Sequence, residues 1–333
     1  MASRLRIGII SELYSITTPP QKYGGIARIV HYLSEELVRR GYDVTLFALP
    51  GSSTSGLLVT VQAGDSQDGP RPPYVDVALS YVGDIDVWID GSHHKRFARE
   101  CSAGNVLCPS WNPNRADIPI NPVLQSPHMF EQLGLKEGSA PCFFVGIPMP
   151  DPELRRLSDT IVSMNVMTAY KGVHRAVAAA RHCGFDLELY GHAPDVKWYE
   201  HNVLRPAMQS DNISLFGLAG RERFDIFRRA AASISLVTWP EPGSLASIES
   251  MACGCPVIAT GAGCFPYYIE SGVNGVLTDS DPESVCSAME AVLSAGEGMR
   301  IAAREFAEEN FSLGKYVDEW EALFMKIMEG ERW

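Results

Sequence analysis

The stretch from residue 232 to residue 259 constrains the fold of this chain more than any other segment. It reads as a strand (residues 232–238), a turn with Gly243, a short helix closed by Gly254, and a second strand from Pro256. A strand, a helix and a strand in this order form the βαβ unit of a parallel sheet. The segment therefore predicts an α/β protein with a doubly wound sheet.

Two glutamates lie on the connection between these strands. Glu241 follows the first strand, which places its carboxylate at the C-terminal edge of the predicted sheet, and Glu249 lies about one to two turns into the helix. The first N–H groups of that helix face the same crevice, where an anion such as a diphosphate binds well. Backbone amides can bind the phosphates of a nucleotide-sugar, and carboxylates can bind its hydroxyls. The segment therefore suits a nucleotide-sugar.

Strand and helix patterns alternate along the rest of the chain, as a doubly wound fold requires. With 333 residues the chain is longer than the roughly 250–300 residues at which one core stops growing, so two domains are expected. The other expected strands are residues 6–10, 42–48, 85–89, 105–108, 159–164 and 186–190, and the expected helices include residues 26–39, 173–182 and 313–328.

Composition narrows the class of protein. The net charge of −12 argues against nonspecific binding to nucleic acid or to anionic lipid. No segment reaches the ~18 uninterrupted apolar residues of a membrane span, and the N-terminus enters a strand at once without a signal-peptide pattern. The eight cysteines show no disulfide framework, so a reducing cytoplasm is the expected location.

The loop after the first strand separates this chain from the nicotinamide enzymes that share doubly wound folds. No G-x-G-x-x-G follows residues 6–10, which argues against dinucleotide binding. A longer loop leads instead to Gly24 and Gly25 at the start of a helix. Paired glycines there let the backbone approach a bound group and expose N–H donors.

Residues 239–256 resemble the signature of retaining glycosyltransferases of family 4. Residues 212–217, 221–230, 254–260 and 272–275 match the pattern of that family in the same order. The resemblance implies the GT-B architecture, in which two Rossmann-like doubly wound domains face each other across a cleft.

The resemblance also implies domain boundaries. Residues 1–148 would form an acceptor-side domain, braced by a C-terminal helix within residues 313–333. Residues 153–312 would bind the nucleotide-sugar. Acceptor recognition would fall to the loops at residues 17–23, 63–73 and 111–119, and neither the acceptor nor the oligomeric state follows from the sequence.

Roles for single residues follow from the resemblance as well. Glu241 would contact hydroxyls of the donor sugar and Glu249 those of the ribose. Lys171, which opens a helix together with Gly172, would balance the charge of the leaving phosphate. Residues expected to bind the phosphates or to precede the base pocket are Gly24, Gly25, Gly217, Gly243, Ser244, Leu245 and Ala246.

The chain departs from the family pattern at several of these positions. Val166 stands where the family has a phosphate-binding arginine, which His174 or Arg175 would have to replace. The family's histidine is displaced along residues 86–94, so Asp90 or His93 is expected to hold the sugar's hydroxyls, with His94 as an alternative. Further departures are Asn165 for a glycine, Pro242-Gly-Ser-Leu for Phe-Gly-Leu, and Tyr267 for a glutamate.

The predicted reaction is the transfer of a sugar from a UDP- or GDP-sugar to an acceptor hydroxyl with retained configuration. Two D-x-D triplets, Asp84 to Asp86 and Asp279 to Asp281, could hold a metal, but Asp281-Pro282-Glu283 reads as a helix start. With Lys171 and helix dipoles to balance the diphosphate, no metal or other cofactor is expected. A nucleotide-sugar epimerase and a degenerate protein that only binds nucleotide-sugars are the alternatives.

Overall fold

The computed structural model describes residues 4–14, 16–64, 70–111 and 120–333. The chain divides into two compact units: Met1–Pro148 with Ser312–Trp333, and Met149–Phe311. Residues 65–69 and 112–119, in two of the loops expected to recognise an acceptor, lie outside the described residues.

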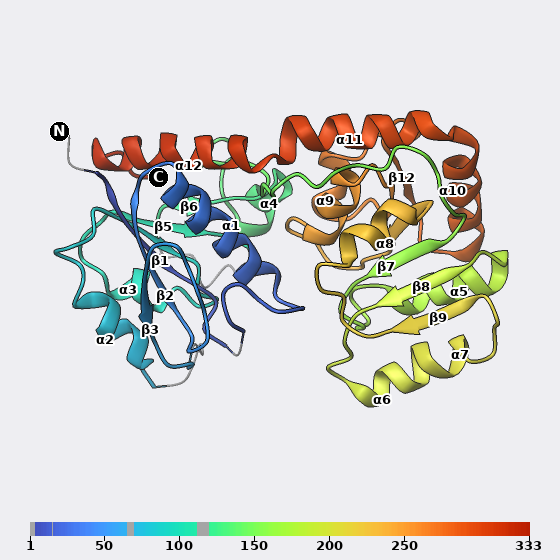
Figure 1. Cartoon of the computed structure of the whole chain (residues 1–333), viewed down its shortest axis with the longest axis horizontal. Coiled ribbons are helices and arrows are strands. Elements are labelled where there is room, and N and C mark those ends of the chain that lie inside the picture. The colour runs from blue at the N-terminus through green and yellow to red at the C-terminus, as the bar shows by residue number, and fades with distance from the viewer. Residues whose placement is uncertain (1–3, 15, 65–69, 112–119) are drawn as a thin grey trace. The chain divides into compact units, whose positions relative to one another are not determined.

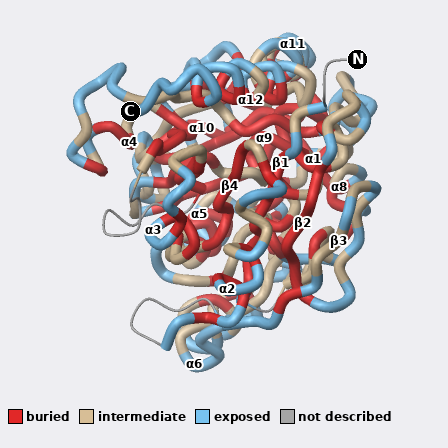
Figure 2. Tube along the Cα trace, turned by 90° about the vertical axis from the view of Figure 1, so that its left-hand side faces the viewer, coloured by how far each residue is buried: buried red, intermediate tan, exposed pale blue. Residues whose placement is uncertain are grey.

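A six-stranded parallel sheet forms the centre of the first unit (Figure 1). The strand order is β3-β2-β1-β4-β5-β6, so the direction of winding reverses between β1 and β4. The strands are β1 (Arg6–Ile10), β2 (Asp43–Ala48), β3 (Leu57–Thr60), β4 (Val87–Asp90), β5 (Val106–Pro109) and β6 (Pro122–Val123). Apart from the edge strand β3, the residues of these strands are largely buried (Figure 2). A parallel sheet is covered by helices on both faces.

The helices of the first unit are α1 (Gly25–Arg39), α2 (Pro73–Leu79), α3 (Arg96–Glu100), α4 (His128–Leu133) and α12 (Leu313–Met328). Residues of α2 and α3 pack in one cluster with Phe47 and Trp88. Helix α1 packs on β2, and α12 packs on α1 and β4. Arg40, at the end of α1, pairs with Asp318 at 2.6 Å and Glu321 at 2.5 Å, which ties α12 to this unit.

The second unit is built on another six-stranded parallel sheet, ordered β12-β11-β10-β7-β8-β9. Its strands are β7 (Ile161–Met164), β8 (Leu187–Tyr190), β9 (Ile213–Phe216), β10 (Ala232–Ser235), β11 (Val257–Thr260) and β12 (Gly275–Thr278). The chain winds outward from β7 to β9, crosses back to β10, and winds outward again to β12. The reversal therefore lies between β7 and β10.

Helices cover both faces of the second sheet. On one face α5 (Val173–Cys183) packs with α10 (Pro282–Ala295), and on the other α9 (Leu245–Ala252) packs with α8 (Arg223–Arg229) and α11 (Glu297–Phe311). The remaining turns are α6 (Val196–Tyr199), the π-helical turn η2 (Glu200–Leu204), α7 (Arg205–Ala207) and the 3₁₀ turn η3 (Phe265–Tyr267).

Several predicted elements are confirmed closely. β1 spans the predicted residues 6–10, and α12 the predicted residues 313–328. Asp281 caps α10 by accepting a hydrogen bond from Ser284 N at 2.9 Å, as its sequence suggested. The short elements β3, β6 and α2 to α4 were not predicted, because segments of two to seven residues carry too little periodicity.

The expectation about cysteine is wrong in one respect. Cys183, at the end of α5, and Cys286, in α10, form a disulfide with their Cα atoms 5.7 Å apart. The two positions are 103 residues apart in the sequence, and only the packing of α5 on α10 brings them together. Cys253 and Cys255 are free and buried, which is consistent with their being small residues that pack in the core. Among the described residues, no helix combines the length and apolarity needed to cross a membrane.

Candidate functional site

The candidate site lies at the carboxyl edge of the second sheet, where the winding reverses between β7 and β10. In open α/β sheets, ligands bind outside the carboxyl ends of the strands at such a switch point. The loop after β7 carries Lys171, and the loop after β10 carries Trp239 and Glu241. Two segments that are far apart in the sequence thus contribute charged and aromatic side chains to one place.

Lys171 and Glu241 form an ion pair there. The distance from Lys171 Nζ to Glu241 Oε2 is 2.5 Å, and the two side chains are 17% and 7% exposed. The indole N–H of Trp239 donates to the same oxygen at 2.7 Å. The two charged residues were predicted to have separate roles, Lys171 on phosphate and Glu241 on sugar, and the structure brings them into direct contact.

The backbone fixes this contact. Gly172 has φ +68°, and a Cβ on it would lie 1.7 Å from the carbonyl oxygen of Leu236, so only glycine fits this close approach. Thr238 N donates to the carbonyl of Tyr170 at 2.9 Å, which joins the two loops directly. Cys264 N donates to the carbonyl of Glu241 at 2.8 Å and holds the glutamate from its other side.

Helix α9 begins at Leu245, four residues after Glu241. Ser244 precedes the helix with φ +42°, a left-handed conformation that glycine adopts more easily. Its hydroxyl hydrogen-bonds with that of Ser247 at 2.8 Å. The first N–H groups of a helix have no partner within it and carry its positive dipole end. The predicted phosphate-binding residues Gly243 to Ala246 therefore form an electropositive helix start next to the Lys171–Glu241 pair.

Glu249 lies inside α9 and is only 2% exposed. Its carboxylate pairs with Arg223 of α8, with 2.9 Å between Arg223 Nη2 and Glu249 Oε1. Arg223 also donates to the carbonyl of Gly220 at 2.9 Å and stacks on the ring of Phe224. Sequence reasoning placed Arg223 in a helix but assigned it no role. In the structure Arg223 orients Glu249, the residue predicted to bind the ribose.

The carboxyl ends of β8 and β9 flank the switch point. Gly217 follows β9, its carbonyl accepts a hydrogen bond from Gly191 N at 3.3 Å, and the space at its Cβ position is open. Phe216 is 45% exposed and stacks on Tyr190 with 4.8 Å between ring centres. Gly217 thus ends its strand beside an exposed aromatic ring.

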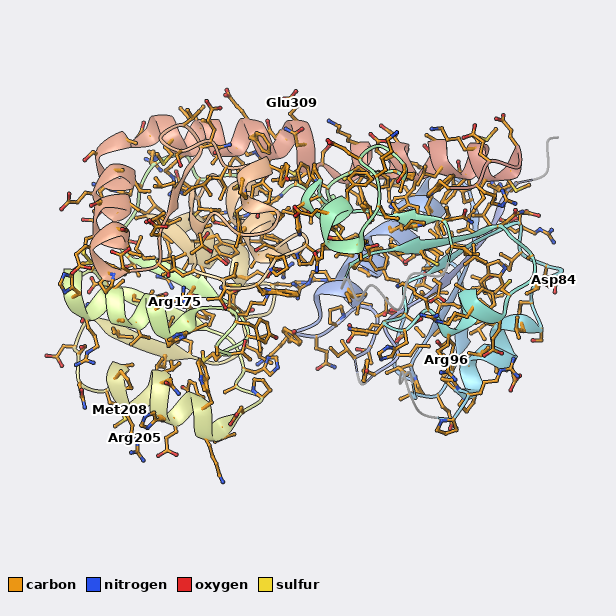
Figure 3. The ribbon with its side chains drawn as sticks, turned by 180° about the vertical axis from the view of Figure 1, so that it is seen from behind. Asp84, Arg96, Arg175, Arg205, Met208 and Glu309 are labelled. Atoms are coloured by element: carbon orange, nitrogen blue, oxygen red, sulfur yellow. A yellow bond between two sulfur atoms is a disulfide. The ribbon has the colours of Figure 1, made fainter. Side chains whose placement is uncertain are left out.

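The two residues considered as replacements for the missing arginine are both engaged elsewhere. Arg175 projects from α5 (Figure 3). Its guanidinium donates to the hydroxyl of Ser280. His174 contacts the ring of Trp198 edge-on at 5.5 Å, and burial, assisted by Arg175, lowers the pKa of this histidine. Neither contact supports a role in place of the arginine that Val166 replaces.

The glycine pair predicted to approach a ligand lies at the switch point of the first sheet. Gly24 has φ +139°, and a Cβ there would lie 2.7 Å from Ile16 Cγ2, so the loop requires glycine. Gly25 begins α1, a helix of 15 residues without an acidic residue in its first turn. This helix start is therefore also electropositive.

The loop after β4 corrects the expectation for Asp90. Asp90 is fully buried, and its carboxylate accepts hydrogen bonds from Ser92 N at 3.1 Å, Ser92 Oγ at 2.6 Å and Ala98 N at 3.0 Å. Burial raises the pKa of Asp90. These contacts organise the loop and the start of α3, which leaves the carboxylate no access to a ligand.

His93 and His94 keep the predicted place in that loop. Tyr14, from the loop after β1, contacts the ring of His93 edge-on at 5.0 Å and hydrogen-bonds to His94 Nε2 at 2.9 Å. Both histidines therefore contact the exposed side chain of Tyr14 at the carboxyl edge of the first sheet. No role was predicted for Tyr14 from the sequence, since its partner His94 is 80 residues away along the chain.

The two D-x-D triplets have structural explanations. Asp86 accepts hydrogen bonds from Arg6 at 2.6 and 3.1 Å, and the contact lowers the pKa of its carboxyl group. Asp281 caps α10. Within the ranges that the structure describes, no group of three or more His, Cys, Asp or Glu side chains could hold a metal ion.

Comparison with known proteins finds similarity to glycosyltransferases. Residues 152–310 match the sequence model of the family described as glycosyl transferases group 1. A D-inositol 3-phosphate glycosyltransferase of Corynebacterium jeikeium is 35% identical over 80 residues, which are 24% of this chain and 19% of that protein. The aligned region is thus about a fifth of the relative's length.

Solved structures show that the fold extends over the whole chain. AviGT4, a glycosyltransferase involved in avilamycin A biosynthesis, has a TM-score of 0.78 at 22% identity and covers 99% of both chains. HepE from Anabaena, crystallised with UDP-glucose, has a TM-score of 0.75 at 14% identity and covers 96% of this chain and 99% of its own. The chain therefore has the predicted GT-B fold.

Proposed function

Residues 152–310 match the group 1 glycosyl transferases, and on that premise we propose that the protein moves a sugar from a nucleoside-diphosphate donor to an acceptor hydroxyl. The observation that carries the proposal is the Lys171–Glu241 pair beside the N-terminus of α9 at the switch point of the second sheet. At this place the cation and the helix N–H groups can bind a diphosphate, and the carboxylate can bind hydroxyls.

Lys171 and the N–H groups at residues 243–246 would balance the charge that develops on the leaving diphosphate, and Glu241 would hold hydroxyls of the donor sugar. Glu249, oriented by Arg223, would accept from the ribose once that ion pair opens toward the ligand. For Gly24 and Gly25 we propose phosphate binding, and for His93 binding of a hydroxyl of the donor sugar. A lysine and a helix dipole supply the positive charge, so the proposed transfer requires no metal ion.

We further propose that the reaction retains the anomeric configuration by a front-face route. We do not assign Glu241 as a nucleophile, because Lys171 and Trp239 both hold its Oε2. In this route the bond from the anomeric carbon to the phosphate oxygen breaks as the acceptor oxygen bonds to that carbon on the same face. The departing phosphate oxygen takes the acceptor's proton. UDP-sugars are the first donors to test, because HepE shares the fold and binds UDP-glucose.

The experiment measures release of nucleoside diphosphate from a panel of UDP- and GDP-sugars, with a mixture of candidate acceptors and with EDTA present. We expect release with at least one donor, and a product whose anomeric configuration, read by NMR, matches the donor's. Glu241→Gln should reduce kcat by about 10²–10³-fold, because it removes the charge but keeps the shape. Glu290→Gln, the same change at an exposed position on α10, is the matched control and should leave kcat unchanged.

The alternatives give different results. Tight donor binding without release in any mixture would support a protein that only binds nucleotide-sugars, as the Val166 substitution would suggest. Isomerised donor without acceptor would indicate an epimerase, which the comparisons do not support. Full activity of Glu241→Gln would contradict the proposed site.

A further inference from the structure

Trp239 touches both members of the charged pair at the candidate site. Its indole N–H donates to Glu241 Oε2 at 2.7 Å, and Lys171 Nζ lies over its ring at 5.0 Å from the centre. Tyr170 meets the indole edge-on at 5.5 Å, and its own ring lies 5.9 Å from the ammonium. A half-buried tryptophan therefore holds the glutamate through its edge and the lysine through its face.

The position of the indole is set by backbone contacts. Trp239 directly follows Thr238, whose N–H donates to the carbonyl of Tyr170. Gly172 packs on the carbonyl of Leu236, three residues before the tryptophan. Backbone contacts thus fasten the two loops on both sides of Lys171 and immediately before Trp239, so the Lys171–Trp239 contact does not depend on side-chain packing alone.

The two oxygens of Glu241 are in different environments. Oε2 accepts from both Lys171 and Trp239, whereas the structure gives Oε1 no hydrogen-bond partner among the residues that it describes. A carboxylate held by one oxygen in this way can rotate little, and its other oxygen keeps a fixed direction. That oxygen remains available to accept a hydrogen bond from a hydroxyl.

We propose that Trp239 is a positioning residue that keeps Glu241 oriented when a diphosphate draws Lys171 away. An anion at the start of α9 competes for the ammonium and weakens the Lys171–Glu241 contact. The indole N–H then becomes the remaining donor on Oε2, and Oε1 stays turned toward the sugar. The proposal rests on the proposed function, since it assumes that a diphosphate donor binds at this site.

Replacement by phenylalanine separates the two contacts. Trp239→Phe removes the N–H donor but keeps an aromatic face for Lys171. The variant loses one hydrogen bond to a charged group. Because of the usual strength of such a bond, we expect kcat to fall by about 10- to 100-fold. The KM for the donor should change by less than about threefold, because the lysine that binds phosphate keeps its support. Trp239→Ala removes both contacts and should raise the KM as well.

Trp198→Phe provides the matched control. Trp198 lies on α6 and packs against His174, so the same chemical change is made in the same unit outside the site. Its kcat and KM should equal those of the unmodified protein. If Trp239→Phe also keeps the kcat of the unmodified protein, the inference is wrong while the proposed function stands.

A second measurement does not depend on turnover. The indole N–H resonance of Trp239 is assigned in a ¹H–¹⁵N spectrum by its absence from Trp239→Phe. In Glu241→Ala it should move upfield by several tenths of a ppm, because the N–H loses a charged acceptor. An unmoved resonance would overturn the inference even if no donor were turned over, whereas a moved resonance with no nucleoside diphosphate release would count against the proposed function alone.

Discussion

The bond between Cys183 and Cys286 allows a quantitative test of the structure. It joins the end of α5 to α10 and closes a loop with a sequence separation of 103 residues, all of it within the second unit. Both cysteines are partly exposed, so a small reductant can reach the bond without unfolding the protein. Reduction, or replacement of one cysteine by serine, removes the cross-link from the unfolded chain and leaves the helices in place.

The size of the effect follows from the length of the loop. A cross-link that closes about 100 residues lowers the entropy of the unfolded chain enough to stabilise the fold by about 4.7 kcal/mol at 25 °C. In a unit of 150–250 residues each kcal/mol shifts the thermal midpoint by about 2–4 °C. We therefore expect reduction to lower the midpoint of the second unit by roughly 10–20 °C.

The assay is thermal unfolding followed by circular dichroism, with and without dithiothreitol. Thiol titration of the denatured, unreduced protein should find six reactive cysteines, corresponding to the six that the structure leaves free. Cys183→Ser should abolish the effect of dithiothreitol on the midpoint. Cys142→Ser, which removes a partly exposed free cysteine of the first unit, should leave that effect intact.

Two results would refute this reasoning. Eight reactive thiols before reduction would mean that α5 and α10 do not carry a bond. Alternatively, mass spectrometry could detect the bond while its reduction moves the thermal midpoint by less than about 2 °C. Closing the loop would then contribute little to the stability of the unit. The second result would leave the packing of α5 on α10 intact but would remove the estimate based on loop length.

Two further predictions concern α9. Ser244→Val should lower the thermal midpoint by roughly 4–8 °C, because a β-branched residue at φ +42° costs about 2 kcal/mol, whereas Ser244→Gly should change it little; circular dichroism checks both. Arg223→Met should destabilise the protein by about 3–5 kcal/mol in urea unfolding, since it removes the cation that faces the buried carboxylate of Glu249. The double variant Arg223→Met/Glu249→Gln should recover a large part of that loss, and no recovery would contradict a direct pairing.

Local patterns in the sequence were enough to place the elements around the site. The apolar run that ends near Thr238, followed by Glu241 and a helix closed by Gly254, predicted β10, α9 and the start of β11. The paired glycines at the start of α1 were also visible. Such features depend on side chains within one turn or one strand of each other, so the sequence alone carries them.

The contacts that make the site depend on the order of strands. β10 returns to pair with β7, and this return brings Glu241 to Lys171, a residue 70 positions earlier. The same packing joins Arg223 to Glu249, while in the first unit burial withdraws Asp90 from the role that its sequence context suggested. No local pattern records these outcomes, because they follow from which strand lies beside which.

The sequence by itself therefore determined the α/β class, the position of the acidic residues at a sheet edge and the helix start that follows. The tertiary structure decided which charges meet, which carboxylate is buried and which cysteines bond. The physical reason is that secondary structure responds to neighbours along the chain, whereas ion pairs, buried hydrogen bonds and disulfides form only after the sheet has set distant segments side by side.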